Sequence, residues 1–217
     1  MKDIQELHRL ASPAPKPQSL AWDGATLWMG SRETKRIYAL DPQTWTVRAE
    51  YAAPGTPYGM TAVGKELRVL CSETAEDNRI VRRLVPGTGF DATWQLPCPD
   101  DSGSQLSYDG QRLHVSQWYP KKVLRVSDDG KVERVITAPH GICGQVFVGP
   151  VLYLLTTDAE ETTEYWLTRV DLPVGGEPVI TDVARVPFQA RGLAWDGTKF
   201  WTNHREQNQI VAFAPVT

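Results

Sequence analysis

The sequence predicts an all-β fold built from a repeated unit, because one turn motif recurs five times and apolar residues alternate with polar ones beside it. The motif is clearest at residues 20–24 and 193–197, which both read Leu-Ala-Trp-Asp-Gly. Weaker copies occupy residues 60–64, 106–110 and 145–149, and in every copy a large apolar residue follows the glycine by three positions. Asp-Gly and its relatives accept the positive φ of a two-residue type I′ turn, so each copy predicts a β-hairpin.

The spacing of the motif predicts that the units close into a ring. The steps between successive motif glycines are 40, 46, 39 and 48 residues, and the step from the last glycine through the chain ends to the first would be 44. These glycines are Gly24, Gly64, Gly110, Gly149 and Gly197. The repeat therefore fits the whole chain five times.

Two more strands follow each hairpin. Third apolar strands are expected at residues 37–40, 80–84, 123–126, 166–170 and 210–213, and fourth strands at 46–51, 92–96, 132–136 and 179–186. The fifth repeat ends without a fourth strand, and residues 4–10 are expected to supply it. Four strands in about 40 to 45 residues are typical of a β-propeller blade. We therefore expect residues 1–217 to form a single domain, a five-bladed β-propeller with four antiparallel strands per blade, closed by the N-terminal strand that completes the last blade. Trp22, Trp28, Trp195 and Trp201 are expected to pack blade against blade.

Composition excludes several classes of function. Lys and Arg number 23 against 26 Asp and Glu, a net charge of −3, so nucleic acid is not expected as a partner. The most apolar stretch, residues 142–155, contains Gln145 and Pro150 and is too short to cross a membrane. The charged residues 1–10 lack the apolar core of a signal peptide, and three widely spaced cysteines suit a reducing compartment. A cytoplasmic monomer is expected, and a secreted or periplasmic chain stays open if a leader has been removed.

A ligand site is expected at one mouth of the central channel, where the first strands begin. Counting back from each motif gives an inner ring of Gln18, Tyr58, Ser104, Cys143 and Arg191, and loops at residues 31–35, 71–78, 117–121, 157–164 and 203–208 form an outer ring. The predicted ligand-binding residues are Gln18, Arg32, Tyr58, Gln105, Trp118 and Arg191. Arg32 and Arg191 would pair with a carboxylate, and Trp118 would form an apolar wall. His204 is the first choice for a catalytic base, with Glu73 as the other catalytic candidate.

Other polar residues receive structural interpretations. The spacing of His140 and Cys143 is compatible with zinc, but no second close pair accompanies it, so no metal site is predicted. No cofactor is indicated. The acidic run of Glu160, Glu161 and Glu164 is read as a solvated loop, and the basic residues Arg79, Arg82 and Arg83 are read as a solvated outer edge.

Residues 19–31 with 36–44 resemble a blade of the glutamine cyclotransferase family, five-bladed propellers of similar length, and also resemble blades of the streptogramin (virginiamycin B) lyase group. Residues 59–67 and 117–121 are similar to further parts of the cyclotransferase pattern. The first resemblance implies cyclisation of an N-terminal glutamine with a glutamate, after the aromatic residue of a second strand, as proton shuttle. The second implies metal-assisted elimination with a histidine. The second strands here place Met29, Val69, Val115, Leu154 and Thr202 at the glutamate's position, so the family's catalytic motif is not found.

Two functions follow from this reading. The first is binding of a small molecule or peptide end at the channel mouth, with cyclotransferase, lyase or hydrolase catalysis left open. The second is a non-catalytic propeller scaffold for protein–protein interaction. A polar pocket at the mouth, with Arg32 and Trp118 turned inward, would favour the first, and a channel plugged by apolar side chains would favour the second.

Overall fold

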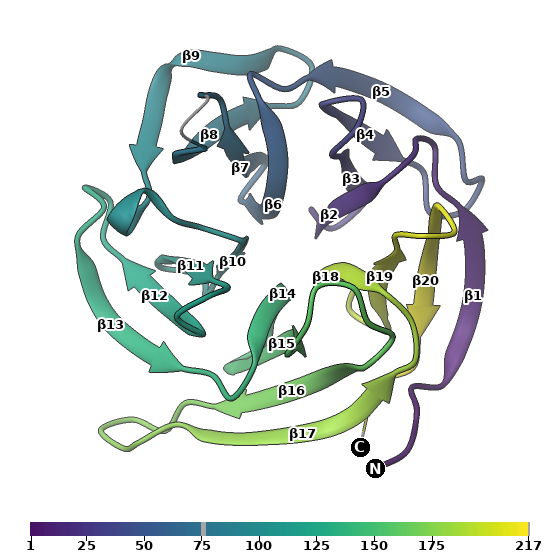
Figure 1. The fold of residues 1–217 in the computed structure, drawn as a ribbon. Coiled ribbons are helices and arrows are strands. Elements are labelled where there is room, and N and C mark those ends of the chain that lie inside the picture. The colour runs from purple at the N-terminus through teal and green to yellow at the C-terminus, as the bar shows by residue number, and fades with distance from the viewer. Residues whose placement is uncertain (75–76, 217) are drawn as a thin grey trace.

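The computed structural model describes residues 1–74 and 77–216, and their strands form five four-stranded antiparallel sheets arranged around a central axis (Figure 1). The first strand of each sheet lies nearest the centre and the fourth lies on the perimeter. This is the expected five-bladed propeller. No helix among these residues combines the length and apolar character that a bilayer crossing requires.

Each blade takes its strands in order from the centre outwards. Blade 1 comprises β2 (Pro17–Trp22), β3 (Leu27–Ser31), β4 (Arg36–Leu40) and β5 (Val47–Ala52). Blade 2 comprises β6 (Thr56–Val63), β7 (Glu66–Ser72), β8 (Arg79–Val85) and β9 (Gly89–Pro97). Blade 3 comprises β10 (Gln105–Tyr108), β11 (Leu113–Gln117), β12 (Lys122–Val126) and β13 (Val132–Thr137), and a 3₁₀ turn, η1 (Pro99–Asp101), precedes it. Blade 4 comprises β14 (Gly141–Val148), β15 (Val151–Thr157), β16 (Tyr165–Asp171) and β17 (Val179–Val186). Blade 5 comprises β18 (Ala190–Trp195), β19 (Phe200–His204), β20 (Gln209–Phe213) and β1 (Glu6–Ala11).

The N-terminal strand closes the ring. Strand β1 pairs antiparallel with β20, with Leu10 opposite Ile210, so both ends of the chain contribute to blade 5. The residues before β1 also reach blade 4, where the Ile4 backbone N–H donates to the Arg185 carbonyl at 2.8 Å. Asp3 pairs with the Arg185 side chain at 2.8 Å. The predicted closure is confirmed.

The hairpins at the five motif glycines fall into two kinds. All five glycines have positive φ, from 57° at Gly149 to 103° at Gly24. In blades 2 and 4 the loop has two residues, and only its first, the glycine, has positive φ, which fits a type II′ rather than the expected type I′ turn. In blades 1, 3 and 5 the loop has four residues instead of two. The expectation of a two-residue type I′ turn is therefore wrong. In blades 1, 3 and 5 the loop is longer because an aspartate side chain accepts hydrogen bonds from the loop backbone.

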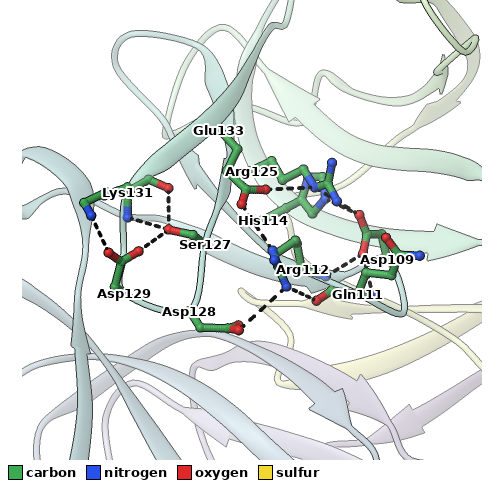
Figure 2. Close-up of polar contacts among 10 residues, drawn as sticks. All are labelled: Asp109, Gln111, Arg112, His114, Arg125, Ser127, Asp128, Asp129, Lys131 and Glu133. Atoms are coloured by element: carbon green, nitrogen blue, oxygen red, sulfur yellow. Dashed lines mark hydrogen bonds and ion pairs between the residues drawn. The ribbon is translucent and has the colours of Figure 1, made fainter.

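That aspartate holds the four-residue loop and the second strand together. Asp23 accepts hydrogen bonds from the backbone N–H of Thr26 at 2.8 Å and from the Trp28 indole at 2.7 Å. Blade 5 repeats the indole bond between Trp201 and Asp196 at 2.8 Å. In blade 3 a histidine replaces the tryptophan, and Figure 2 shows it in a group with Asp109 and with Arg125, which pairs with Glu133. There His114 Nε2 lies 3.0 Å from Asp109 Oδ2.

The hydrophobic core consists of five clusters, one between each pair of neighbouring blades. Trp28 lies in the cluster between blades 1 and 2, and Trp201 lies in the cluster between blades 5 and 1, where it stacks on Trp45 at 5.8 Å. Trp22 and Trp195 are partly buried against the clusters beside β2 and β18. Packing of blade against blade by the four motif tryptophans is therefore observed, and it fixes the five first strands around the channel.

Candidate functional site

Four of the five first strands carry a β-bulge at the same mouth of the channel. The extra residues are Gln18 in β2, Tyr58 in β6, Cys143 in β14 and Gly192 in β18. A bulge re-aims a side chain that would otherwise follow the alternation of the strand. The bulge therefore re-aims Gln18, Tyr58 and Cys143 of the inner ring. In β18 the extra residue directly follows Arg191, and β10, which begins after Ser104, pairs with β11 without a register shift.

Glycines bring the first strands close together just below this mouth. A Cβ atom on Gly59 would lie 2.6 Å from the backbone of Gln105 in the next blade. A Cβ atom on Gly144 would lie 2.8 Å from the backbone of Gly192. Side chains at these positions would push the blades apart, so the glycines narrow the channel into the floor of a cavity.

The cavity at this mouth has a volume of about 380 Å³. All five expected loops and all five inner-ring residues contribute to its lining. The structure places every predicted ligand-binding residue there, namely Gln18, Arg32, Tyr58, Gln105, Trp118 and Arg191. Their role in binding stays a prediction, whereas their convergence on one polar cavity is observed.

Three arginines from blades 1 and 5 meet on one side of the cavity. Arg191, which is 7% exposed, donates to the Tyr165 hydroxyl and to the Ala190 carbonyl, the latter at 2.9 Å. Arg205 donates to Gln18 Oε1, and its buried Nε has no partner among the described residues. Arg32 lies exposed on the loop between β3 and β4. These three side chains carry most of the positive charge of the site.

The three guanidinium groups lack carboxylate partners. No ion pair among residues 1–74 and 77–216 includes Arg32, Arg191 or Arg205. Burial lowers the pKa of Arg205 to about 10, and repulsion from Arg191 and Arg32 lowers it further in the same direction. Arg205 still carries its charge at neutral pH. The cavity lining holds four arginines against Asp77, Asp101 and Glu160, so the site keeps an excess of positive charge, and none of these carboxylates forms an ion pair with the three guanidinium groups.

Tyr58 separates this surface from a fourth arginine. The guanidinium of Arg79 lies 3.6 Å from the centre of the Tyr58 ring, and that of Arg32 lies 5.5 Å from it. Arg79 also donates from Nε to the Gly103 carbonyl at 3.0 Å and pairs with Asp77. The interpretation of Arg79 as a solvated outer edge is therefore wrong. Arg79 is the first residue of β8, the third strand of blade 2, and this strand begins at the mouth that holds the cavity. That position in the repeat could have indicated that Arg79 lines the cavity.

The remaining wall combines an aromatic ring, a thiol and two amides. Trp118 lies against Gly141, where a Cβ atom would come within 2.6 Å of the indole. Burial raises the pKa of the Cys143 thiol, so the thiol is neutral at neutral pH and is not prepared as a nucleophile. The side-chain amides of Gln105 and Gln18 both donate to the Tyr58 carbonyl, at 2.9 and 3.4 Å. The cavity therefore combines the apolar indole of Trp118 with polar groups and with its positive charge.

The two predicted catalytic residues lie outside this cavity. His204, the last residue of β19, stacks on Phe188 at 4.6 Å, and its buried Nδ1 has no partner among the described residues. Burial lowers the pKa of His204, with repulsion from Arg9 acting in the same direction. Glu73 forms a bidentate pair with Arg82 at 2.6 and 2.7 Å. Neither side chain lines the cavity, because His204 stacks on Phe188 and Glu73 pairs with Arg82.

His140 and Cys143 are also separated. Cys143 lines the cavity, whereas His140 stacks on Trp166 at 4.3 Å and contacts Asp158 at 2.9 Å. No three His, Cys, Asp or Glu side chains in the described part of the chain are grouped in a way that could hold a metal ion.

The opposite mouth of the channel differs in character. Its cavity measures about 140 Å³ and is lined mainly by apolar and aromatic side chains, among them Trp22, Met60, Phe147 and Trp195. Gln145 contributes the main polar group, since its amide donates to the His114 carbonyl at 2.7 Å. Arginines thus line the cavity at the first mouth, and no lysine or arginine is among the residues that line the cavity at the hairpin mouth.

Comparison with known proteins supports the fold. No protein-family model matches the chain, and no curated protein matches it in sequence. The structure is similar to glutaminyl cyclase from Myxococcus xanthus, with a TM-score of 0.70, 10% identity and 97% of each chain covered. It is also similar to a PQQ-bound aldose sugar dehydrogenase from Streptomyces coelicolor, with a TM-score of 0.63, 13% identity and 98% of each chain covered. A chain of the mitotic checkpoint complex matches with a TM-score of 0.57 and 10% identity over 100% of this chain and 94% of the other. The expected resemblance to a cyclotransferase propeller is confirmed for the fold, and proteins of such different activities share that fold.

Proposed function

We propose that the chain binds a carboxylate-bearing small molecule or peptide end at the cationic mouth of its channel. The observation that carries this proposal is the convergence of Arg32, Arg191 and Arg205 without a carboxylate partner among the described residues. Bringing like charges together in a partly buried site costs stability unless an anion joins them. A bound carboxylate would supply that anion.

The rest of the cavity suits the organic part of such a ligand. Arginine forks match the two oxygens of a carboxylate, which fixes the orientation of its carbon skeleton. Trp118 and Tyr58 would then contact apolar atoms beside the carboxylate. A volume of about 380 Å³ lies within the range of small-molecule sites.

The proposal is one of binding. The side chains expected to act as acid or base lie elsewhere, and the thiol that does line the cavity is neutral. The alternative of a scaffold without a ligand is less well supported, because the mouth is an open polar cavity and not a channel plugged by apolar side chains.

Calorimetric titration tests the proposal with N-acetyl amino acids and the matching primary amides. The acids should bind, the amides should not, and affinity for the acids should fall as ionic strength rises. Arg32→Gln should weaken binding about tenfold or more, in line with a charged hydrogen bond of about 1.5–3 kcal/mol. Inorganic phosphate serves as a competing anion.

Arg36→Gln is the matched control, because Arg36 leaves the same loop and pairs with Glu50 on the outer strand at 3.1 Å. It should bind the acids as the unchanged chain does. Equal binding of acid and amide, tighter binding of phosphate than of any carboxylate, or equal losses in the Arg32 and Arg36 variants would each contradict the proposal.

A further inference from the structure

A second depression continues the cationic cavity across the loops of blades 4, 5 and 1. It has a volume of about 650 Å³ and shares four lining residues with the cavity. Those residues are Arg32, Glu160, Arg191 and Arg205. The shared residues place the two spaces side by side, so the second lies directly next to the position of a ligand anchored at the channel mouth.

A third depression extends this path. It measures about 590 Å³ and shares Glu161, Gln189 and Glu206 with the second. The second and third depressions together form one groove, here called the exit groove, which lies next to the cationic cavity. It runs over the loop between β15 and β16 and the loop between β19 and β20.

Charge changes sign along this groove. The cavity is lined by four arginines and three carboxylates, the latter from Asp77, Asp101 and Glu160. In the second depression Glu33, Glu160, Glu161 and Glu206 face an equal number of basic side chains, whereas the lining of the third includes Glu161 and Glu206 and no basic residue. Lys16 offsets Glu33, with which it pairs at 3.6 Å. The other three glutamates have no ion-pair partner in the described part of the chain. The outer end of the exit groove therefore complements positive charge.

Two amides of the exit groove retain hydrogen-bonding capacity. Gln189 donates from Nε2 to the Glu160 carbonyl at 3.1 Å, which leaves its Oε1 as an acceptor. Asn208 accepts from the Lys16 backbone N–H at 2.7 Å with Oδ1, which leaves its amide N–H groups as donors. One donor and one acceptor along a path suit the alternating N–H and C=O groups of an extended peptide.

Resting on the proposed function, we infer that the ligand is the C-terminal segment of a peptide, with its free carboxylate at the arginines and a Lys or Arg side chain upstream in the exit groove. A lone carboxylate would occupy only the inner cavity and would leave the acidic part unused. A basic peptide with a free C-terminus matches both ends at once. Glu160 and Glu161, interpreted from sequence as a solvated loop, become the residues that select the basic side chain.

Calorimetry on the full chain tests this inference with a fixed set of probes. They are N-acetylalanine, an acetylated six-residue alanine peptide, the same peptide with two lysines upstream of its last two residues, its glutamate counterpart, and C-terminally amidated forms. The lysine peptide should bind about five- to tenfold more tightly than the alanine peptide, as two exposed ion pairs would give. The glutamate peptide should bind more weakly than the alanine peptide, and amidation should remove binding.

The variant Glu161→Gln/Glu206→Gln separates the two proposals. Both side chains are exposed, so the fold is not at risk. The variant should lose the preference for the lysine peptide and keep its affinity for N-acetylalanine, whereas Glu177→Gln, on an exposed loop outside the groove, should change neither. Equal affinity for N-acetylalanine and all free-acid peptides would overturn the inference and leave the proposed function standing. Binding unaffected by amidation would overturn both.

Discussion

The two mouths of the channel are built from the same five strands, yet they carry different side chains. At the hairpin mouth the aspartates of blades 1, 3 and 5 are paired with tryptophan, histidine or lysine, as in the 2.8 Å contact between Lys199 and Asp196. At the opposite mouth the strands begin with bulges and the loops contribute arginines that lack carboxylate partners. The hairpin mouth stabilises the ring, and the cationic mouth holds charges that a ligand would stabilise.

This division allows stability and binding to be changed separately. Substitutions at the hairpin mouth should lower the free energy of unfolding and leave ligand affinity unchanged. Substitutions at the cationic mouth should lower affinity with little loss of stability.

Trp201→Ala should give the largest effect. Trp201 is 2% exposed, donates to Asp196 and stacks on Trp45, so its removal should cost about 3–5 kcal/mol of stability. Trp118→Ala, at the cationic mouth, removes a partly exposed ring and should cost about 1 kcal/mol while weakening ligand binding. Urea unfolding measures both. Equal losses of stability in the two variants would show that the mouths do not differ in this way, and Trp201→Phe provides a milder variant if the first does not fold.

Arg205→Met should change affinity and stability in opposite directions. Removing this guanidinium should weaken carboxylate binding about tenfold or more. It also relieves repulsion from Arg191 and Arg32 and removes a buried Nε without a partner, so the melting temperature without ligand should stay the same or rise. Thermal unfolding with and without N-acetylalanine measures both quantities. A marked fall in the melting temperature of the ligand-free variant would mean that Arg205 is structural.

The sequence alone was sufficient for the blades and for the inner ring. The motif glycines and strand alternation are local signals, and counting back from each motif identified Gln18, Tyr58 and Arg191 because every blade repeats the same register. The bulges did not alter that count, since the extra residue lies two positions before the motif in blades 1, 2 and 4 and one position before it in blade 5.

Side-chain partners across blades could not be predicted. His204 turns to Phe188 and Glu73 turns to Arg82, and both choices depend on residues distant in sequence or on another strand. Arg205 reaches Gln18 across the closure of the ring, which no local pattern indicates. The four-residue loops depend on an aspartate that accepts from the backbone two and three positions later, as Asp23 does from Ala25 at 2.9 Å.

Mild acid should distinguish blade 3 within the hairpin mouth. Blades 1 and 5 hold Asp23 and Asp196 with indoles, which do not titrate, whereas blade 3 uses His114. Burial lowers the pKa of His114 although Asp109 acts in the opposite direction, and Arg125 and Arg134 add repulsion. A histidine with a lowered pKa stays neutral when the unfolded chain takes up a proton. Stability should therefore be complete above about pH 6.5 and fall as the pH drops below that value.

His204 contributes with the same sign, because burial lowers its pKa as well. Urea unfolding at pH 7.5 and 5.5 should thus show a fall in stability for the unchanged chain, a smaller fall for His114→Gln, and a smaller fall for His204→Gln. Asp109 does not add to this loss of stability between pH 7.5 and 5.5. Burial raises the pKa of its carboxyl, but hydrogen bonds from His114 and from two backbone N–H groups outweigh burial and lower that pKa below the usual 3.8. A loss of stability in acid that is unchanged in His114→Gln would mean that the histidine is accommodated in both protonation states. Blade 3 would then respond to acid as blades 1 and 5 do, although it replaces their tryptophan with a histidine.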